Sequence, residues 1–138
     1  MINFIFSLKP WLRITLGLIY LVLIILLSLL PTSNLPDIPF FSGEDKWIHF
    51  CMYMGLGFVA CWSLDMRGKR MPSLYMLLAG VFAWGVLMEI LQRLMSNGRG
   101  MELLDMLANL AGAVAGLIVY RFMDRKWKMD AVNVKANE

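Results

Sequence analysis

Polar and ionisable residues gather at the ends of three apolar stretches in this sequence. They are Asp45, Lys46, His49 and Tyr53 in one stretch, Glu89 and Gln92 in the next, and Arg99, Glu102, Asp105 and Asn109 around the start of the last. Ionisable groups are costly to place inside hydrophobic segments, so their presence there indicates a functional site. Carboxylates beside a histidine and basic groups can transfer protons, orient a bound anion or hold a metal ion.

The first group lies on one face of an expected helix. Asp45, His49 and Tyr53 are spaced four residues apart, which places them in one stripe, and Lys46 is one residue along. A lone histidine at this depth is also consistent with an ordinary interfacial residue.

Glu89 lies deeper than a carboxylate normally does. It precedes Met95, where we expect the helix to end, by six residues, or about 9 Å at 1.5 Å per residue. Gln92 and Arg93 follow at positions i+3 and i+4. An intrahelical ion pair between Glu89 and Arg93 is the simpler structural alternative.

The third group opens another expected helix. Glu102, Asp105 and Asn109 share a face at spacings of three and four. The two acids also suit the positive N-terminal end of a helix. Asn109 lies deeper and needs a partner across the helix bundle.

Small residues continue this helix as a ladder of Ala108, Gly112 and Gly116. Such spacing allows another helix to approach closely. It is also a candidate surface for a homo-oligomer.

The composition places the chain among membrane proteins. Its residues are 59% hydrophobic and 17% charged, against about 45–50% and about 25% in soluble domains. A membrane span needs about 20 apolar residues, and four segments approach that length: 14–30, 47–64, 73–95 and 103–122. The sequence therefore predicts an all-α polytopic membrane protein with a four-transmembrane-helix bundle. A signal peptide is the rival interpretation of the first segment, but its apolar core is usually about 7–15 residues long and precedes an A-x-A-like site.

Basic residues predict the orientation. Ten of the 13 Lys and Arg residues fall in the N-terminal lead 1–13, the loop 65–72 and the region from Arg121 onward. The positive-inside rule assigns these regions, and so both termini, to the cytoplasm. The polar groups then lie at the outer end of a membrane domain spanning 14–122. We expect the polar tail 123–138 to fray.

Three ordered motifs resemble the VanZ-like family of small bacterial integral membrane proteins. They are D-K-x-x-H at 45–49, E-x-x-Q at 89–92 and R-x-x-x-x-x-D-x-x-x-N-x-x-G at 99–112. The resemblance extends from the first outer loop to the end of the fourth helix. It implies a bacterial cytoplasmic membrane location and marks the site positions Asp45, Lys46, His49, Tyr53, Glu89, Gln92, Arg99, Asp105 and Asn109. The family is named after a teicoplanin-resistance protein, and a link to glycopeptide resistance comes from that name alone.

The first functional hypothesis is a non-enzymatic factor that binds an anionic envelope component at the outer leaflet. The ligand would be a membrane lipid or a cell-wall precursor. Arg99, Lys46 and His49 would contact its anionic head group, and the carboxylates would orient these bases.

Three alternatives rank below it. An intramembrane enzyme would use Glu89 or Asp105 as general base and His49 as acid. A small proton-coupled transporter would carry its proton on Glu89. A divalent metal site ranks last, because one histidine and no nearby thiolate disfavour zinc, although magnesium or calcium could use the acids.

Other features narrow the function further. No Ser or Cys nucleophile accompanies the cluster, and no H-E-x-x-H motif is present, which argues against a hydrolase with a covalent intermediate. We expect no cofactor, no bound metal and no nucleic-acid partner.

Overall fold

The computed structural model is all-helical. It describes residues 2–29, 44–67, 70–95 and 103–136, and no strand occurs within them. The helices are α1 (Ile2–Ser7), α2 (Pro10–Leu29), α3 (Glu44–Ser63), α4 (Met71–Met95) and α5 (Leu103–Ala136).

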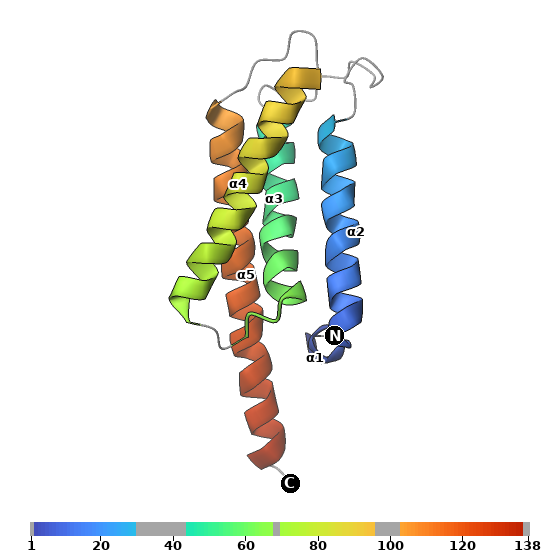
Figure 1. Cartoon of the computed structure of the whole chain (residues 1–138). Coiled ribbons are helices and arrows are strands. Elements are labelled where there is room, and N and C mark those ends of the chain that lie inside the picture. The colour runs from blue at the N-terminus through green and yellow to red at the C-terminus, as the bar shows by residue number, and fades with distance from the viewer. Residues whose placement is uncertain (1, 30–43, 68–69, 96–102, 137–138) are drawn as a thin grey trace.

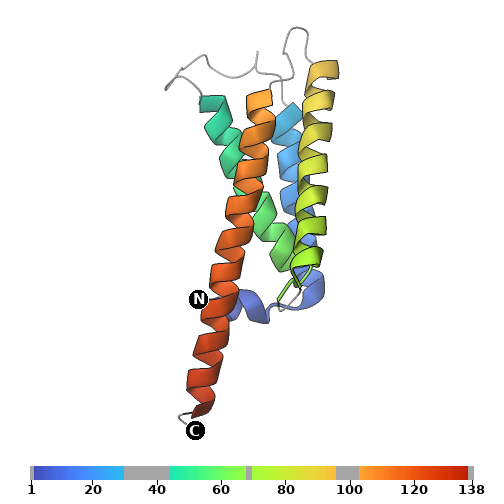
Figure 2. The same cartoon turned by 90° about the vertical axis from the view of Figure 1, so that its left-hand side faces the viewer.

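The four long helices run alongside one another (Figures 1 and 2). α3 packs most extensively against α5 and also contacts α2 and α4, and α4 likewise contacts the other three long helices. The short α1 crosses the foot of the bundle and contacts α5, whose C-terminal part projects beyond the other helices.

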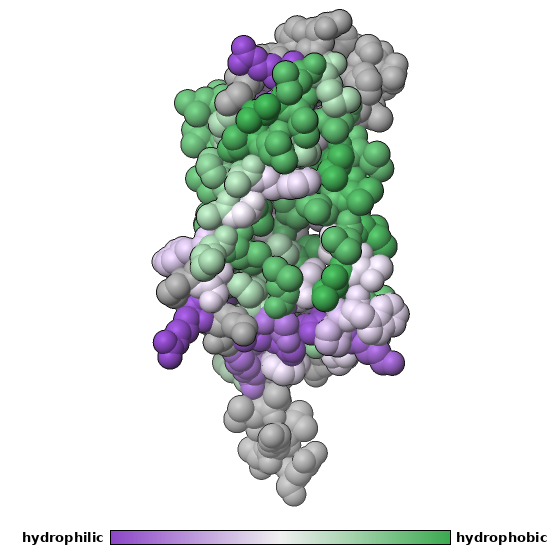
Figure 3. Space-filling model, viewed as in Figure 1, coloured by the Kyte–Doolittle hydropathy of each residue, from purple (hydrophilic) through white to green (hydrophobic). Residues whose placement is uncertain are grey.

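Within the described residues, three helices are long and apolar enough to cross a membrane: Pro10–Leu29, Ser73–Met95 and Leu103–Met129. Many of their large apolar side chains face outward, including Leu18, Leu26, Leu107 and Ile118. In Figure 3 apolar residues cover the middle of the molecule, and hydrophilic residues form a belt near its lower end. This surface suits lipid, because exposed apolar area of this extent is unusual for a soluble monomer.

α3 differs from the other three long helices. It spans 20 residues but is not among the three candidate spans, because Glu44, Asp45, Lys46 and His49 lower the apolar character of its first turns. A helix surrounded by other helices needs less lipid-facing surface than its neighbours do. The structure thus supports three of the four predicted spans by length and composition.

Several helix boundaries differ from the sequence-based prediction. α2 begins at Pro10 rather than residue 14, and α1 was not predicted. The last helix continues to Ala136 instead of ending at 122, so the expected fraying of the tail is replaced by helix. No Gly or Pro follows Gly116 to stop it. The expected turns within 30–43 and 96–102 lie outside the described residues.

Glycines allow α3 and α5 to meet backbone to backbone. A Cβ atom added to Gly112 would overlap the carbonyl oxygen of Phe50, and one added to Gly116 would overlap that of Met54. The predicted close approach at the small-residue ladder therefore occurs within one chain, and a homo-oligomer through this surface stays a prediction.

A buried ion network fixes the end of the bundle where α3 stops. Arg13 of α2 is 3% exposed, and its guanidinium lies 3.3 Å from Asp65 and 3.5 Å from the carbonyl oxygen of Trp62. Arg67 donates to the same carboxylate and lies 5.0 Å from the ring of Trp127 in α5. Asp65 has a φ of 49°, a left-handed conformation that Asp and Asn tolerate better than most residues. The network thus ties α2, the α3–α4 turn and α5 together.

Asp65→Asn should destabilise the protein by on the order of 1 kcal/mol at neutral pH. Asparagine keeps the tolerated φ and removes the charge that faces Arg67 and Arg13. The carboxylate is 40% exposed, so solvent screening limits the loss. Thermal unfolding in detergent at pH 7 would measure the difference from wild type.

The same variant should show a defined pH dependence. Hydrogen bonds from Arg67, and secondarily from Arg13, lower the pKa of Asp65 to about 2 from its ordinary 3.8, although partial burial opposes the shift. Because the folded-state pKa is depressed, the contribution of Asp65 is present above pH 3.8 and is lost as the pH falls toward 2. The gap between wild type and Asp65→Asn should therefore narrow at pH 2, and an unchanged gap would rule out this charge effect.

Candidate functional site

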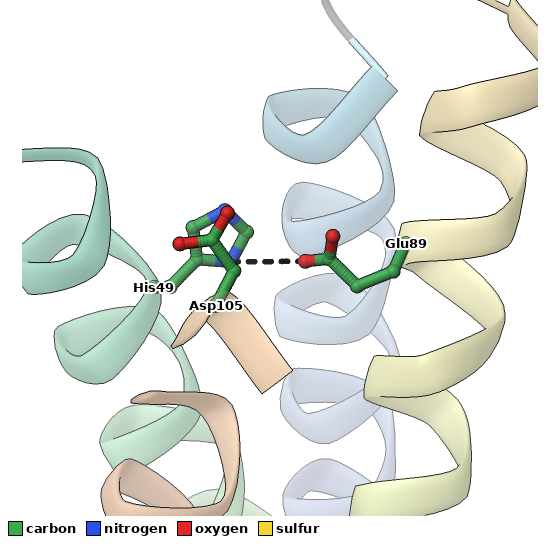
Figure 4. Close-up of side chains that lie close together, drawn as sticks. All are labelled: His49, Glu89 and Asp105. Carbon is green, nitrogen blue, oxygen red and sulfur yellow. Dashed lines mark ion pairs between the residues drawn. The ribbon is translucent and has the colours of Figure 1, made fainter. Parts of the chain in front are cut away.

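Side chains from three helices converge at the other end of the bundle. Three side chains meet here: His49 of α3, Glu89 of α4 and Asp105 of α5. One ring nitrogen of the histidine and one carboxylate oxygen of each acid lie within 4.8 Å of one another. Figure 4 shows the three side chains pointing toward a common space. Glu89 is 3% and Asp105 8% exposed, so two carboxylates are buried next to one imidazole. We call these three residues and Asn109 the polar cluster.

His49 connects the three helices. Its Nδ1 lies 3.0 Å from Oδ1 of Asn109 on α5 and 3.8 Å from Oε1 of Glu89 on α4. An amide oxygen only accepts hydrogen bonds, so Nδ1 donates to Asn109. The expectation that Asn109 needs a partner across the bundle is confirmed.

Lys46 lies at the edge of the polar cluster, one turn before His49. Its Nζ is 2.7 Å from Oδ2 of Asp45 and 3.6 Å from Oδ1 of Asp105. The lysine side chain is 30% exposed. It therefore connects a buried carboxylate with the surface of the bundle.

Tyr53 and Asn109 fit together because Gly85 of α4 has no side chain. A Cβ at Gly85 would lie 3.1 Å from the Tyr53 ring and 3.3 Å from Nδ2 of Asn109. Both residues are almost wholly buried. The Tyr53 hydroxyl and the Asn109 Nδ2 make no hydrogen bond with any residue that the structure describes. The cluster thus contains donors that are available to a ligand.

The remaining predicted site residues behave differently. Gln92 faces α2, where its Nε2 donates to the carbonyl oxygen of Ser28 at 2.8 Å. Arg93 is exposed, and Glu89 reaches His49, so an intrahelical pair with Arg93 is not the whole explanation of Glu89. Arg99 and Glu102 lie outside the described residues.

Two contributors were not predicted. Gly85 lies one helical turn before Glu89 on the same face of α4, and that spacing could have identified it. Ser28 lies outside the polar cluster, but its backbone carbonyl holds Gln92, a contact that leaves no signal in the sequence.

Charge and burial limit what this site can do. Asp45, Glu89 and Asp105 supply three carboxylates, and Lys46 supplies one ammonium. Among these described residues carboxylates outnumber the ammonium, which favours a cation or an exchanging proton, whereas an anion needs additional positive charge from outside the described residues. Glu89 Oε1 lies 3.8 Å from His49 Nδ1, so proton transfer between them requires a closer approach or one bridging water.

Comparisons with known proteins give no further guidance: no family model, no curated protein and no solved structure matches the chain.

Proposed function

We propose that this chain is a VanZ-like protein of the bacterial cytoplasmic membrane that binds the head group of an anionic envelope lipid or cell-wall precursor. In this proposal all four long helices cross the membrane. The polar cluster faces outward, and both termini are cytoplasmic. A link to teicoplanin resistance rests on the family resemblance alone.

The arrangement of the helix ends supports this orientation. The chain termini and the α3–α4 connection lie at one end of the bundle (Figure 1), and these are the regions that hold most of the basic residues. The polar cluster lies toward the opposite end. The positive-inside rule then assigns the cluster to the outer side.

The chemical class of the ligand is inferred from the position of Lys46. Lys46, Trp47 and Phe50 line a surface hollow of about 240 Å³, and Lys46 also reaches Asp105 in the polar cluster. A cation between an apolar hollow and a buried polar site suits an amphiphile. The hydrocarbon chain would lie against Trp47 and Phe50, and its anionic head group would meet Lys46, with Arg99 supplying further positive charge.

Lipid co-purification tests this proposal. Wild type, Lys46→Ala and Arg99→Ala would be purified from native membranes in mild detergent, and bound lipids would be quantified by mass spectrometry. A lost charge-assisted hydrogen bond of about 1.5–3 kcal/mol corresponds to a reduction in retained anionic lipid of more than about tenfold.

Lys128→Ala is the matched control, because Lys128 pairs with Asp124 on α5, away from the cluster, and should retain lipid like wild type. Equal retention by wild type, Lys46→Ala and Arg99→Ala would refute anion binding.

The enzyme alternative rests on the 3.8 Å contact between Glu89 and His49. A buried carboxylate beside an imidazole is a plausible general-base pair. Glu89→Gln should abolish turnover of a bound head group. The unreacted lipid should still co-purify with this variant. A variant that retains full turnover would exclude Glu89 as the base.

A further inference from the structure

The polar cluster has the composition and spacing of a metal site. Two atoms that each lie about 2.1 Å from one metal ion are separated by roughly 3 to 4 Å. One ring nitrogen of His49, one carboxylate oxygen of Glu89 and one of Asp105 all lie within 4.8 Å of one another. Small side-chain rotations would bring all three to coordination distance.

Buried groups without hydrogen-bond partners point to a missing ligand. Asp105 is 8% exposed, and its Oδ1 makes no hydrogen bond with any described residue, although Lys46 lies 3.6 Å away. The fully buried Tyr53 hydroxyl beside Asn109 also makes none within the described chain. Buried polar atoms are normally satisfied. A cation would contact the carboxylate, and a water bound to that cation would donate a hydrogen bond to the hydroxyl oxygen.

Like charges give a second reason for a cation. Glu89 and Asp105 come from different helices and meet in a region that water barely reaches. Two carboxylates at this distance repel each other strongly when the surroundings are apolar. A divalent ion between them converts this repulsion into two attractive contacts.

We propose that His49, Glu89 and Asp105 bind a divalent metal ion, for which Mn²⁺ serves as the probe. One imidazole with two carboxylates suits a first-row ion that accepts mixed nitrogen and oxygen ligands. Asn109 accepts a hydrogen bond from Nδ1 at 3.0 Å, which orients the imidazole and leaves Nε2 as the nitrogen that binds the ion. Three protein ligands leave coordination positions open for water or for an oxygen of a ligand.

If the proposed function holds, the bound ion would also help the anionic head group to bind. Its two positive charges offset the negative charges of Glu89 and Asp105. The neutralised site can then accept a phosphate or carboxylate oxygen of a head group. Metal binding is independent of this step, so it can be tested separately from lipid retention.

Mn²⁺ binding to the full-length protein in detergent tests the proposal. Free Mn²⁺ gives a six-line electron paramagnetic resonance signal that decreases on binding. We expect one site per chain with a Kd tighter than about 100 μM. Glu89→Gln and Asp105→Asn should each weaken binding by more than about tenfold.

Asp124→Asn is the matched control, because Asp124 is another carboxylate of α5, 1% exposed, that pairs with Lys128 far along the helix from Asp105. It should bind Mn²⁺ like wild type. Thermal unfolding of each variant would identify those that fail to fold, and His49→Gln replaces any such variant. The proposal is overturned if wild type binds no Mn²⁺ below millimolar concentration, or if the cluster variants and Asp124→Asn bind it equally. Unchanged lipid retention with normal Mn²⁺ binding would refute only the head-group proposal.

Discussion

Gly116→Ala is expected to destabilise the protein by about 3 kcal/mol, at the upper end of the cost of overpacking. The new Cβ would overlap the carbonyl oxygen of Met54 and lie 2.7 Å from the backbone nitrogen of Phe58. These are backbone atoms of α3, so no flexible side chain can move aside. α3 and α5 must therefore separate along their length, and this separation would also displace His49 from Asn109.

Gly80→Ala is the control for this substitution. Gly80 lies in α4, and a Cβ there meets nothing within 4 Å. Alanine favours helix over glycine by up to about 1 kcal/mol, so this variant should be as stable as wild type or more stable. Thermal unfolding followed by tryptophan fluorescence in detergent would compare the two. Equal melting temperatures for Gly116→Ala and Gly80→Ala would show that α3 and α5 do not meet through their backbones.

Some features of this fold could be predicted because they depend on local spacing. Met95 ends α4 where the polar turn was expected, which places Glu89 inside the helix. Asn109 required a partner because it lies too deep for water, and His49 provides one. Spacings of three and four residues place side chains on a helix face whatever its neighbours are.

Other features depend on how the helices fit together. Gln92 shares a helix end with Glu89, yet it bonds to Ser28 of α2, because the rotation of α4 directs the two side chains to different neighbours. The polar composition of residues 123–138 predicts fraying, yet α5 extends to Ala136. Lys128 pairs with the buried Asp124 one turn earlier, at 2.9 Å, and stabilises this part of the helix.

The placement of the polar cluster on the outer side is the central claim, because the proposed ligands are envelope molecules. Cysteine labelling should give an all-or-none result. Cys51 is exposed and Cys61 buried, so both would be replaced by alanine to give a cysteine-free background. Single cysteines would then be placed at Ser42, which precedes α3 in the sequence, and at Lys135, near the end of α5.

The direct measurement is the reaction of these cysteines with a membrane-impermeant maleimide in spheroplasts. We predict that Ser42→Cys reacts in sealed spheroplasts and that Lys135→Cys reacts only after permeabilisation. The reverse pattern, with Ser42→Cys accessible only from the cytoplasm, would place the polar cluster on the inner side and contradict the proposed function.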